Sequence, residues 1–294
     1  MNKPVTITGN SVVTAANDGQ ATFTIASSDV TLEGFGIEAG RGIVVRSGSE
    51  NVVLENMSVK DSSSVGILVE TGCDGIKICN TEIREAMNDG IRISSTHDIS
   101  LEDNFSNRNL GHGIRLDTSD GAMLTGNRSL LNRFHGFRLD GSNFVLASND
   151  AVENSLRGFA LEDGSQHMLT DNLARENGSH GISLDRITFT TLFDNRSRFN
   201  GATGIRVWDN SNFNLLDDDN VTGNGSHGIL FGFSKCNGVF NQFIFENERS
   251  GLLLTNSTRD ITATDNVIRS NLEFGIGDFG ENVTEGNIVR DNGR

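Results

Sequence analysis

Apolar and polar residues alternate in short runs along the whole chain. In the stretch GISLD, Ile182 and Leu184 share one face of an extended segment, while Ser183 and Asp185 share the other. Alternation with a period of two predicts β-strands. The runs are brief and are separated by Gly, Asn and Asp residues, which favour turns. The chain is therefore predicted to be all-β.

The runs recur with a fixed period. Each repeat holds about three strand-like segments, as in HGIRLD, GAMLTGN and RSLLN between residues 112 and 132. This organisation predicts a single-stranded right-handed parallel β-helix of about 11 to 12 turns, with 22 to 24 residues per turn. A leucine-rich horseshoe is the main alternative, but it needs closer leucines and a helical return segment, which the sequence lacks. The period is marked by a glycine at 42, 66, 90, 113, 136, 158, 181, 204, 228, 251 and 275.

Two columns of asparagine accompany the glycines. An amide carries both donors and an acceptor, so stacked asparagines can bond from one turn to the next at a spacing of about 4.8 Å. The glycine column fits a corner that needs a positive φ or a close backbone approach. The first column contains Asn109, Asn132, Asn154, Asn177, Asn200, Asn224, Asn247 and Asn271. The second contains Asn56, Asn80, Asn104, Asn127, Asn149, Asn172, Asn195, Asn220 and Asn266.

The repeat runs through nearly all 294 residues, which predicts one elongated domain over 1–294. Residues 1–41 are expected to form degenerate first turns, one of them opened by Gly19. The sequence stops in mid-turn after Asn292, before another glycine of the column. We therefore expect a segment of a longer chain, with further β-helix turns, a capping domain or a partner covering the C-terminal end.

The amino-acid composition limits the classes of partner that the chain can be expected to bind. Lys plus Arg is 24 and Asp plus Glu is 39, and the net charge of −15 argues against a nucleic-acid partner. No apolar run approaches the ~18 residues of a membrane span, and the N-terminus is too polar for a secretory signal. The three cysteines lack metal-finger spacing and are predicted to be free buried thiols. Most of the 18 phenylalanines are predicted to fill the core.

Residues at equal offsets from the glycines are predicted to form an outward-facing stripe. The position before the glycine carries Asp89, His112, His135, Arg157, His180, Thr203 and His227. The position two after it carries Arg92, Arg115, Arg138, Ala160, Ser183 and Arg206. The position four after it carries Ser94, Asp117, Asp140, Glu162, Asp185 and Trp208.

The stripe has two interpretations. Neighbouring arginines repel by about 3 kcal/mol per pair at an effective dielectric near 20, so the carboxylates could simply balance them as a salt-bridge ladder. The stripe could instead be a groove for an acidic polysaccharide, in which arginines hold uronate carboxylates. In that interpretation the candidate catalytic residues are His112, Asp117 and His135. The candidate substrate-binding residues are Arg92, Arg115, Arg138, Asp140, Arg157, His180, Asp185, Arg206 and Trp208.

No cofactor is required by this interpretation. The run Asp217, Asp218 and Asp219 could bind Ca²⁺ through its oxygens, and otherwise it is a solvated turn.

The segments EIREAMNDGI, GHGIRLD and NRFHGFRLDGSNFVLASNDAVEN, between Glu82 and Asn154, resemble the catalytic β-helix module of mannuronan (alginate) epimerases. More broadly, the chain resembles the right-handed β-helix repeats of carbohydrate-binding proteins and sugar hydrolases. The resemblance implies an acidic polysaccharide partner and an extracellular or cell-surface location in a prokaryote. It matches a functional His of the family to His135 and an acidic residue to Asp117.

The chain departs from that family at its catalytic centre. Where the family has Tyr followed by Gly-Phe-Asp-Pro-His, this chain reads DGIRIS over 89–94, and it contains no Tyr. Three hypotheses therefore stay open. The first is an epimerase or lyase that abstracts the C5 proton of a polyuronate, with His112 or His135 exchanging the proton. The second is a non-catalytic glycan-binding module, and the third is a structural cell-surface module in which the stripe is only a salt-bridge ladder.

Overall fold

The computed structural model describes residues 4–14 and 21–293. It divides into two compact units, Met1–Val145 (unit 1) and Leu146–Arg294 (unit 2). All elements in the described ranges are β-strands. Within these ranges, no helix has the length and apolar character needed to cross a membrane. Gly19, expected to open a first turn, lies outside the described residues.

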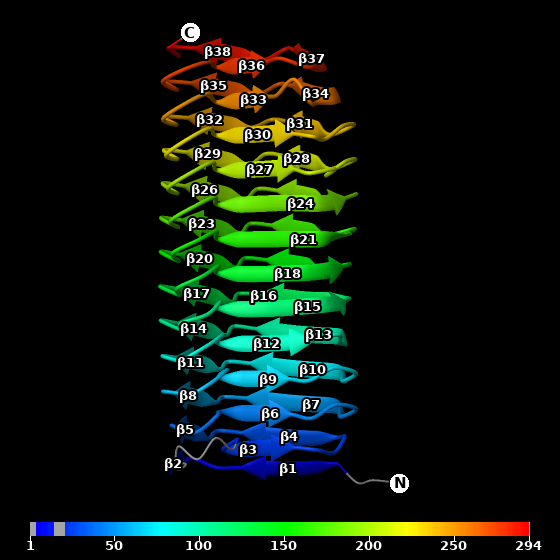
Figure 1. The fold of residues 1–294 in the computed structure, drawn as a ribbon, viewed down its shortest axis with the longest axis vertical. Coiled ribbons are helices and arrows are strands. Elements are labelled where there is room, and N and C mark those ends of the chain that lie inside the picture. The colour runs from blue at the N-terminus through cyan, green and yellow to red at the C-terminus, as the bar shows by residue number, and fades with distance from the viewer. Residues whose placement is uncertain (1–3, 15–20, 294) are drawn as a thin grey trace. The chain divides into compact units, whose positions relative to one another are not determined.

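The strands of unit 1 form three parallel sheets, stacked one strand per turn (Figure 1). Sheet A contains β1 (Val5–Thr8), β4 (Val30–Glu33), β7 (Glu50–Glu55), β10 (Asp74–Cys79), β13 (His97–Glu102) and β16 (Ala122–Thr125). Sheet B contains β2 (Val12–Thr14), β5 (Gly36–Glu38), β8 (Ser58–Lys60), β11 (Glu82–Arg84), β14 (Phe105–Asn107) and β17 (Arg128–Leu130). Sheet C contains β3 (Phe23–Ile25), β6 (Ile43–Val45), β9 (Ile67–Val69), β12 (Ile91–Ser94), β15 (Ile114–Asp120) and β18 (Phe137–Ser142).

Unit 2 repeats the same three-sheet arrangement, and β19 (Val145–Ala147) of sheet A straddles the division. Its sheet A strands are β22 (Met168–Thr170), β25 (Thr191–Phe193), β28 (Leu215–Asp217), β31 (Gly238–Phe240), β34 (Arg259–Thr264) and β37 (Glu281–Glu285). Its sheet B strands are β20 (Asp150–Val152), β23 (Leu173–Arg175), β26 (Arg196–Arg198), β29 (Asn220–Thr222), β32 (Phe243–Phe245), β35 (Val267–Arg269) and β38 (Ile288–Arg290). Its sheet C strands are β21 (Phe159–Ser165), β24 (Ile182–Thr188), β27 (Ile205–Trp208), β30 (Ile229–Gly232), β33 (Leu252–Leu254) and β36 (Ile276–Asp278).

The register of these sheets confirms the predicted parallel β-helix. Ile91 pairs with Ile114 between β12 and β15, and Ile182 pairs with Ile205 between β24 and β27, so each residue lies beside its equivalent in the next turn. The two units together make about 12 turns of about 23 residues. Because side chains alternate along each strand, Ile, Leu, Val and a few Phe point inward and are fully buried.

The recurrent glycines allow the backbones of successive turns to approach closely, which is the second of the two predicted explanations. Of that column only Gly42 has a positive φ, at 69°. At Gly113 a Cβ atom would lie 2.8 Å from the carbonyl oxygen of Gly136 and 2.8 Å from Nδ2 of Asn132. Both distances are well inside van der Waals contact, so any larger residue would push successive turns apart.

Buried asparagine ladders join the turns, as predicted. Asn172 accepts the backbone N–H of Asn149 at 3.0 Å and its side-chain N–H at 3.0 Å. It donates to Oδ1 of Asn195 at 3.0 Å and to the carbonyl of Leu146 at 2.9 Å. The first column behaves in the same way in both units, for example where Asn109 donates to Asn132 at 2.9 Å and Asn177 donates to Asn200 at 2.9 Å. Each amide thus satisfies its full hydrogen-bonding capacity inside the fold.

Three members of the second column were assigned wrongly. Asn56 and Asn80 are turn residues with φ near 50°, and the inward ladder position belongs to the following residue. Asn220 is displaced in the other direction: it lies on β29, one residue after the ladder position, which is taken by Asp219. The error at Asn56 and Asn80 has a simple cause, because Asn suits both the left-handed turn and the ladder position that follows it.

The expectation that most phenylalanines fill the core is also wrong. Only Phe137, Phe144, Phe159 and Phe231 are fully buried. The structure exposes Phe134, Phe189, Phe193, Phe199, Phe213, Phe233, Phe243 and Phe279. The prediction for the cysteines holds: all three are free, with Cys73 and Cys79 buried and Cys236 partly exposed.

Asp219 is a carboxyl group built into an amide ladder. Its Oδ1 accepts from the backbone and side-chain N–H groups of Asn195 at 2.8 and 3.0 Å, as an asparagine would. Its Oδ2 is a buried acceptor with no partner, and so is Oε1 of Gln242 in the next turn. Burial raises the pKa of Asp219 to about 7, although the N–H groups of Asn195 oppose the shift.

We expect Asp219→Asn to stabilise the protein in a pH-dependent manner. The folded-state pKa lies above the unfolded value, so the wild type loses stability as pH rises from about 4 to about 7. Each unit of pKa difference corresponds to about 1.4 kcal/mol. Thermal denaturation should show a gap between variant and wild type that widens from pH 4 to pH 7 and stays constant above it. Asp218→Asn, at an exposed turn, is the control without this dependence, and an equal gap at pH 4 and pH 8 would contradict the assignment.

Candidate functional site

The predicted stripe lies on the outer face of sheet C. In unit 1, the register pairs Arg92 with Arg115 and Arg115 with Arg138 on the adjacent strands β12, β15 and β18. All three arginines are half-buried. Parallel strands lie about 4.8 Å apart, so three positive charges are stacked at that spacing.

One carboxylate holds the three arginines together. Asp117 accepts from Nε of Arg92 at 3.1 Å, from Nε of Arg115 at 2.8 Å and from Nη1 of Arg138 at 2.8 Å. Its side chain is only 17% exposed. The predicted salt-bridge ladder is therefore present in unit 1, centred on one aspartate shared by three turns. Charge-assisted bonds in a partly desolvated setting are stronger than ordinary surface pairs.

A second carboxyl group lies beneath this cluster. Asp89 is 1% exposed, accepts the backbone N–H of His112 at 2.8 Å, and lies 3.9 Å from Nη1 of Arg115. Its Oδ2 has no hydrogen-bond partner. Burial raises the pKa of Asp89, although the His112 amide and the nearby arginines oppose the shift.

The two candidate catalytic histidines of unit 1 lie side by side. The rings of His112 and His135 stack with centroids 5.1 Å apart, and Phe134 flanks His112 at 5.5 Å. Nδ1 of His112 accepts the backbone N–H of His135 at 3.2 Å. That bond requires an unprotonated Nδ1, which leaves the ring hydrogen on Nε2. His112 can therefore donate a hydrogen bond outward, but its basic nitrogen is already engaged.

The electrostatic setting keeps His112 neutral. Burial, followed by the positive charges of Arg115 and Arg138, lowers the pKa of His112 to about 4. His180 in unit 2 repeats the arrangement. Its Nδ1 accepts the backbone N–H of Thr203 at 3.2 Å, and its pKa is likewise lowered to about 4 by burial and by Arg206. His227 accepts the N–H of Ser250 at 3.3 Å.

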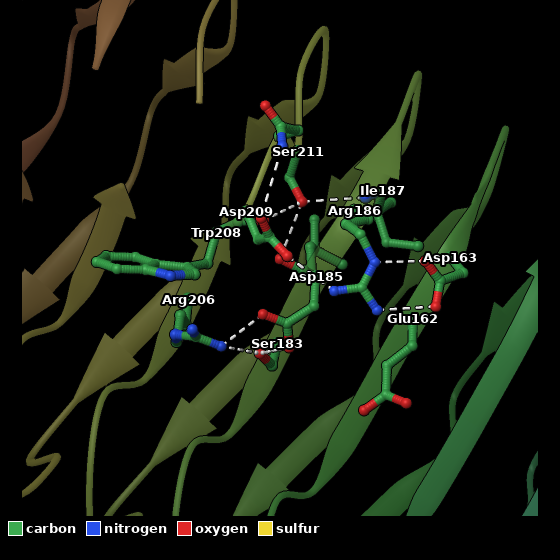
Figure 2. A network of polar contacts seen from close by, with 12 residues as sticks. Glu162, Asp163, Ser183, Asp185, Arg186, Ile187, Arg206, Trp208, Asp209 and Ser211 are labelled. Atoms are coloured by element: carbon green, nitrogen blue, oxygen red, sulfur yellow. Dashed lines mark hydrogen bonds and ion pairs between the residues drawn. The ribbon is translucent and has the colours of Figure 1, made fainter. Parts of the chain in front are cut away.

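Unit 2 carries its own arginine–carboxylate cluster (Figure 2). Asp185 accepts from Nη1 of Arg157 at 2.6 Å and from Nη1 of Arg206 at 2.6 Å. Ser183 donates to the same carboxylate at 3.0 Å. Glu162 lies 3.7 Å from Arg157. Two cations and two acids thus neutralise one another on the outer face of β21, β24 and β27.

Trp208 extends this cluster at the end of β27. The guanidinium of Arg206 lies 5.0 Å from the Trp208 ring, so Arg206 bridges the indole and Asp185 (Figure 2). The indole also packs against Gly232 of the next turn and meets Phe233 edge-on at 5.2 Å.

The structure thus distributes the predicted site residues over two clusters. Unit 1 brings together His112, His135, Asp117 and the three arginines, with Asp140 half-buried on β18. Unit 2 brings together Arg157, Asp185, Arg206 and Trp208, with His180 close to both arginines.

The three residues of the aspartate run 217–219 have different surroundings. Asp217 accepts from Asn241 at 2.8 Å, Asp218 lies at an exposed turn, and Asp219 points into the core. In the part of the chain that the structure describes, no group of three or more His, Cys, Asp or Glu residues could hold a metal ion.

Sequence reasoning missed several contributors to these surfaces. Asp89 was placed in the stripe, but its burial under Arg115 was not foreseen. Phe134 and Phe233 were not singled out among the phenylalanines, most of which were expected in the core, and they contact His112 and Trp208. A usable signal was present for Phe233, because it stands where other turns carry Asp or Asn with positive φ.

Solved structures share this fold. The periplasmic alginate epimerase AlgG is 14% identical, with a TM-score of 0.59 over 92% of this chain and 69% of that chain. The Azotobacter vinelandii mannuronan C-5 epimerase AlgE4 A-module is 16% identical, with a TM-score of 0.64 over 98% and 88%. The pre-mature bacteriophage phi29 gene product 12 is 11% identical, with a TM-score of 0.72 over 99% and 50%. No curated protein sequence matches the chain.

The fold and its outer clusters define a parallel β-helix protein with an arginine- and histidine-bearing face on sheet C. The family described as the right-handed β-helix region matches residues 2–128, 41–189 and 89–243. The chain belongs to this right-handed β-helix family.

The histidine arrangement predicts that His112 and His180 stay neutral, with the hydrogen on Nε2, from pH 8 down to about pH 5. Nitrogen-15 NMR of the imidazoles should show an unprotonated Nδ1 across this range, and the urea-unfolded chain should titrate near pH 6.5. The same shift makes acid destabilising, because the unfolded state binds protons between about pH 6.5 and pH 4 and the folded state does not. Protonation of Nδ1 near pH 6.5 in the folded protein would show that the bond to the next turn is absent.

Proposed function

We propose that this protein binds an acidic polysaccharide on the outer face of sheet C and does not modify it. The proposal rests on one observation: Arg92, Arg115 and Arg138 stack in register around the single carboxylate of Asp117. A guanidinium carries five N–H donors, so Arg92 and Arg115 keep donors beyond the single N–H that each gives to Asp117. These arginines are half-buried on the outer face of sheet C, where they can meet an anionic ligand.

Such a face suits a polymer with one carboxylate on each sugar. Arginine pairs with carboxylates in a planar, two-pronged geometry, and a stack of arginines repeats that geometry along the turns. The fold supports the same partner class, since two of the structures that share it are described as alginate epimerases. Polysaccharide association also agrees with an extracellular or cell-surface location.

The contacts of two candidate catalytic groups, His112 and Asp117, favour binding over chemistry. Abstraction of a C5 proton needs a base with a free lone pair. Nδ1 of His112 is occupied by the His135 amide, and Asp117 is held by three arginines. Epimerase or lyase activity stays the second hypothesis, because the stacked His112 and His135 lie beside Arg115, where a uronate carboxylate would bind.

The binding test uses Arg92→Gln with Arg138→Gln, which leaves Arg115 to neutralise Asp117. We expect the variant to bind alginate or pectate about tenfold more weakly than the wild type at low salt, because two of three cationic contacts are lost. Isothermal titration and co-sedimentation measure the affinity, and dextran serves as the neutral polymer. Arg249→Gln with Arg269→Gln removes the same charge away from the cluster and is the matched control.

If both double variants weaken polymer binding equally, the loss of affinity reflects the overall charge of the protein. That result would contradict a binding site at the arginine cluster of unit 1. The enzyme hypothesis is tested on the same samples, by absorbance of unsaturated uronates and by deuterium exchange at C5. We expect neither signal. Either one, lost on His112→Gln or His135→Gln, would restore the catalytic hypothesis. Absence of any polymer binding would favour the structural module.

A further inference from the structure

Unit 2 contains a cavity that none of the predicted site residues lines. Its volume is ≈ 290 Å³, close to the lower end of small-ligand sites. It is formed by the turns that follow β27, β30 and β33 of sheet C, on three successive coils. Its lining residues are Asn210, Asn212, Phe233, Ser234, Lys235, Ser257 and Arg259.

The charge of the cavity is opposite to that of the chain. Lys235 and Arg259 are both exposed, and no acidic residue lines the cavity. Neither cation forms an ion pair among the described residues, whereas the nearby Asp209 is held by Arg186 at 2.8 Å. Lysine is rare in this sequence, and two uncompensated cations in one cavity favour an anionic ligand.

An amide in the cavity has unused donors. Asn212 accepts the N–H of Lys235 at 2.8 Å through Oδ1, and its amide N–H₂ makes no bond to the described residues. A hydroxyl or carboxylate oxygen of a ligand would accept a hydrogen bond from this amide. Ser234 also lines the cavity, but its Oγ is buried and out of reach of a ligand.

Phe233 gives the cavity a flat wall. Its side chain is 57% exposed, and its backbone has a φ of 49°, in the left-handed region that bulky residues rarely adopt. The equivalent residues Arg186 and Asp209 in the preceding turns have the same positive φ, so the turn requires the conformation and the exposed aromatic ring is what distinguishes Phe233. Two bonds fix the conformation: Phe233 donates to Oγ of Ser257 at 2.9 Å, and its carbonyl accepts from Asn210 at 2.7 Å. The ring also makes a T-shaped contact with Trp208, with centroids 5.2 Å apart.

We infer that this cavity binds one carboxylate-bearing sugar residue. The apolar face of the sugar ring would lie on Phe233, its carboxylate between Lys235 and Arg259, and a hydroxyl on the amide of Asn212. The ligand class rests on the proposed function, but the site is separate from the arginine cluster of unit 1 and includes none of its residues. A neutral sugar would leave both cations unpaired, so the site should discriminate against it.

Trp208 is the only tryptophan and touches Phe233, so intrinsic fluorescence reports on the cavity. We expect a short oligouronate to change Trp208 emission, and a neutral oligosaccharide of equal length to leave it unchanged. Lys235→Gln with Arg259→Gln should weaken the oligouronate titration at least tenfold, and Phe233→Ala should weaken it while Trp208 still reports. Lys60→Gln with Arg249→Gln carries the same charge change and is the control. Arg92→Gln with Arg138→Gln should leave the titration unchanged.

The outcomes separate the two proposals. If the polymer co-sediments with the protein but Trp208 fluorescence shows no change that depends on Lys235 and Arg259, the proposed sugar site in the cavity is wrong. The proposed binding face of unit 1 would stand. The opposite result would be a fluorescence change that depends on Lys235 and Arg259, together with normal polymer binding by Arg92→Gln with Arg138→Gln. It would support the sugar site in the cavity and contradict the proposed arginine face. An equal response to inorganic phosphate or acetate, with no gain from the sugar ring, would reduce the cavity to an anion site and overturn the sugar assignment.

Discussion

The vertical register of the strands governs the structure. Hydrogen bonding of each turn to the next places every residue beside its equivalent about 23 positions away, so a polar group pointing inward must be satisfied by the same position in the neighbouring turn. An asparagine amide meets that demand by itself, since it donates in one direction and accepts from the other. Asn172 does so between Asn149 and Asn195 while also bonding the carbonyl of Leu146. The ladder can therefore continue through any number of turns. Its hydrogen bonds both fix the register between neighbouring turns and stabilise that register.

Charged columns obey the same register with a different result. A neutral amide stacks on its copy favourably, but a guanidinium stacked on its copy repels it. Unit 1 resolves this by centring three arginines on Asp117. In unit 2, the equivalent positions carry Ala160 and Ser183, both fully buried, and Arg157 and Arg206 reach Asp185 from either side. The arginine column therefore extends only over turns in which a carboxylate neutralises the stacked charges. The asparagine columns have no such limit and continue along the chain.

The repeat made the fold predictable, whereas the detailed roles of single residues were not. Period-two alternation, the glycine column and the first asparagine column all correspond to observed features. The errors at Asn56 and Asn80 arose because two adjacent positions accept the same residue type for different reasons. Most phenylalanines were expected in the core because hydrophobicity alone cannot distinguish an inward strand position from an outward turn such as that of Phe233. The role of the His112 ring depends on an amide one turn away, which composition does not encode.

The column before the glycine shows why residue type is a weak guide to chemistry in this fold. Asp89, His112, His180 and His227 all use a side-chain acceptor to bind the backbone N–H one turn on. The residue type changes from carboxyl to imidazole, but the bond is the same, so these histidines have a structural role that accounts for their recurrence. Lys235 and Phe233 differ, because a cation without a counter-ion and an aromatic ring exposed at a turn that elsewhere carries Asp or Arg serve no need of the fold. In a solenoid whose regular positions are explained by stacking, binding is best sought at residues that stacking leaves unexplained.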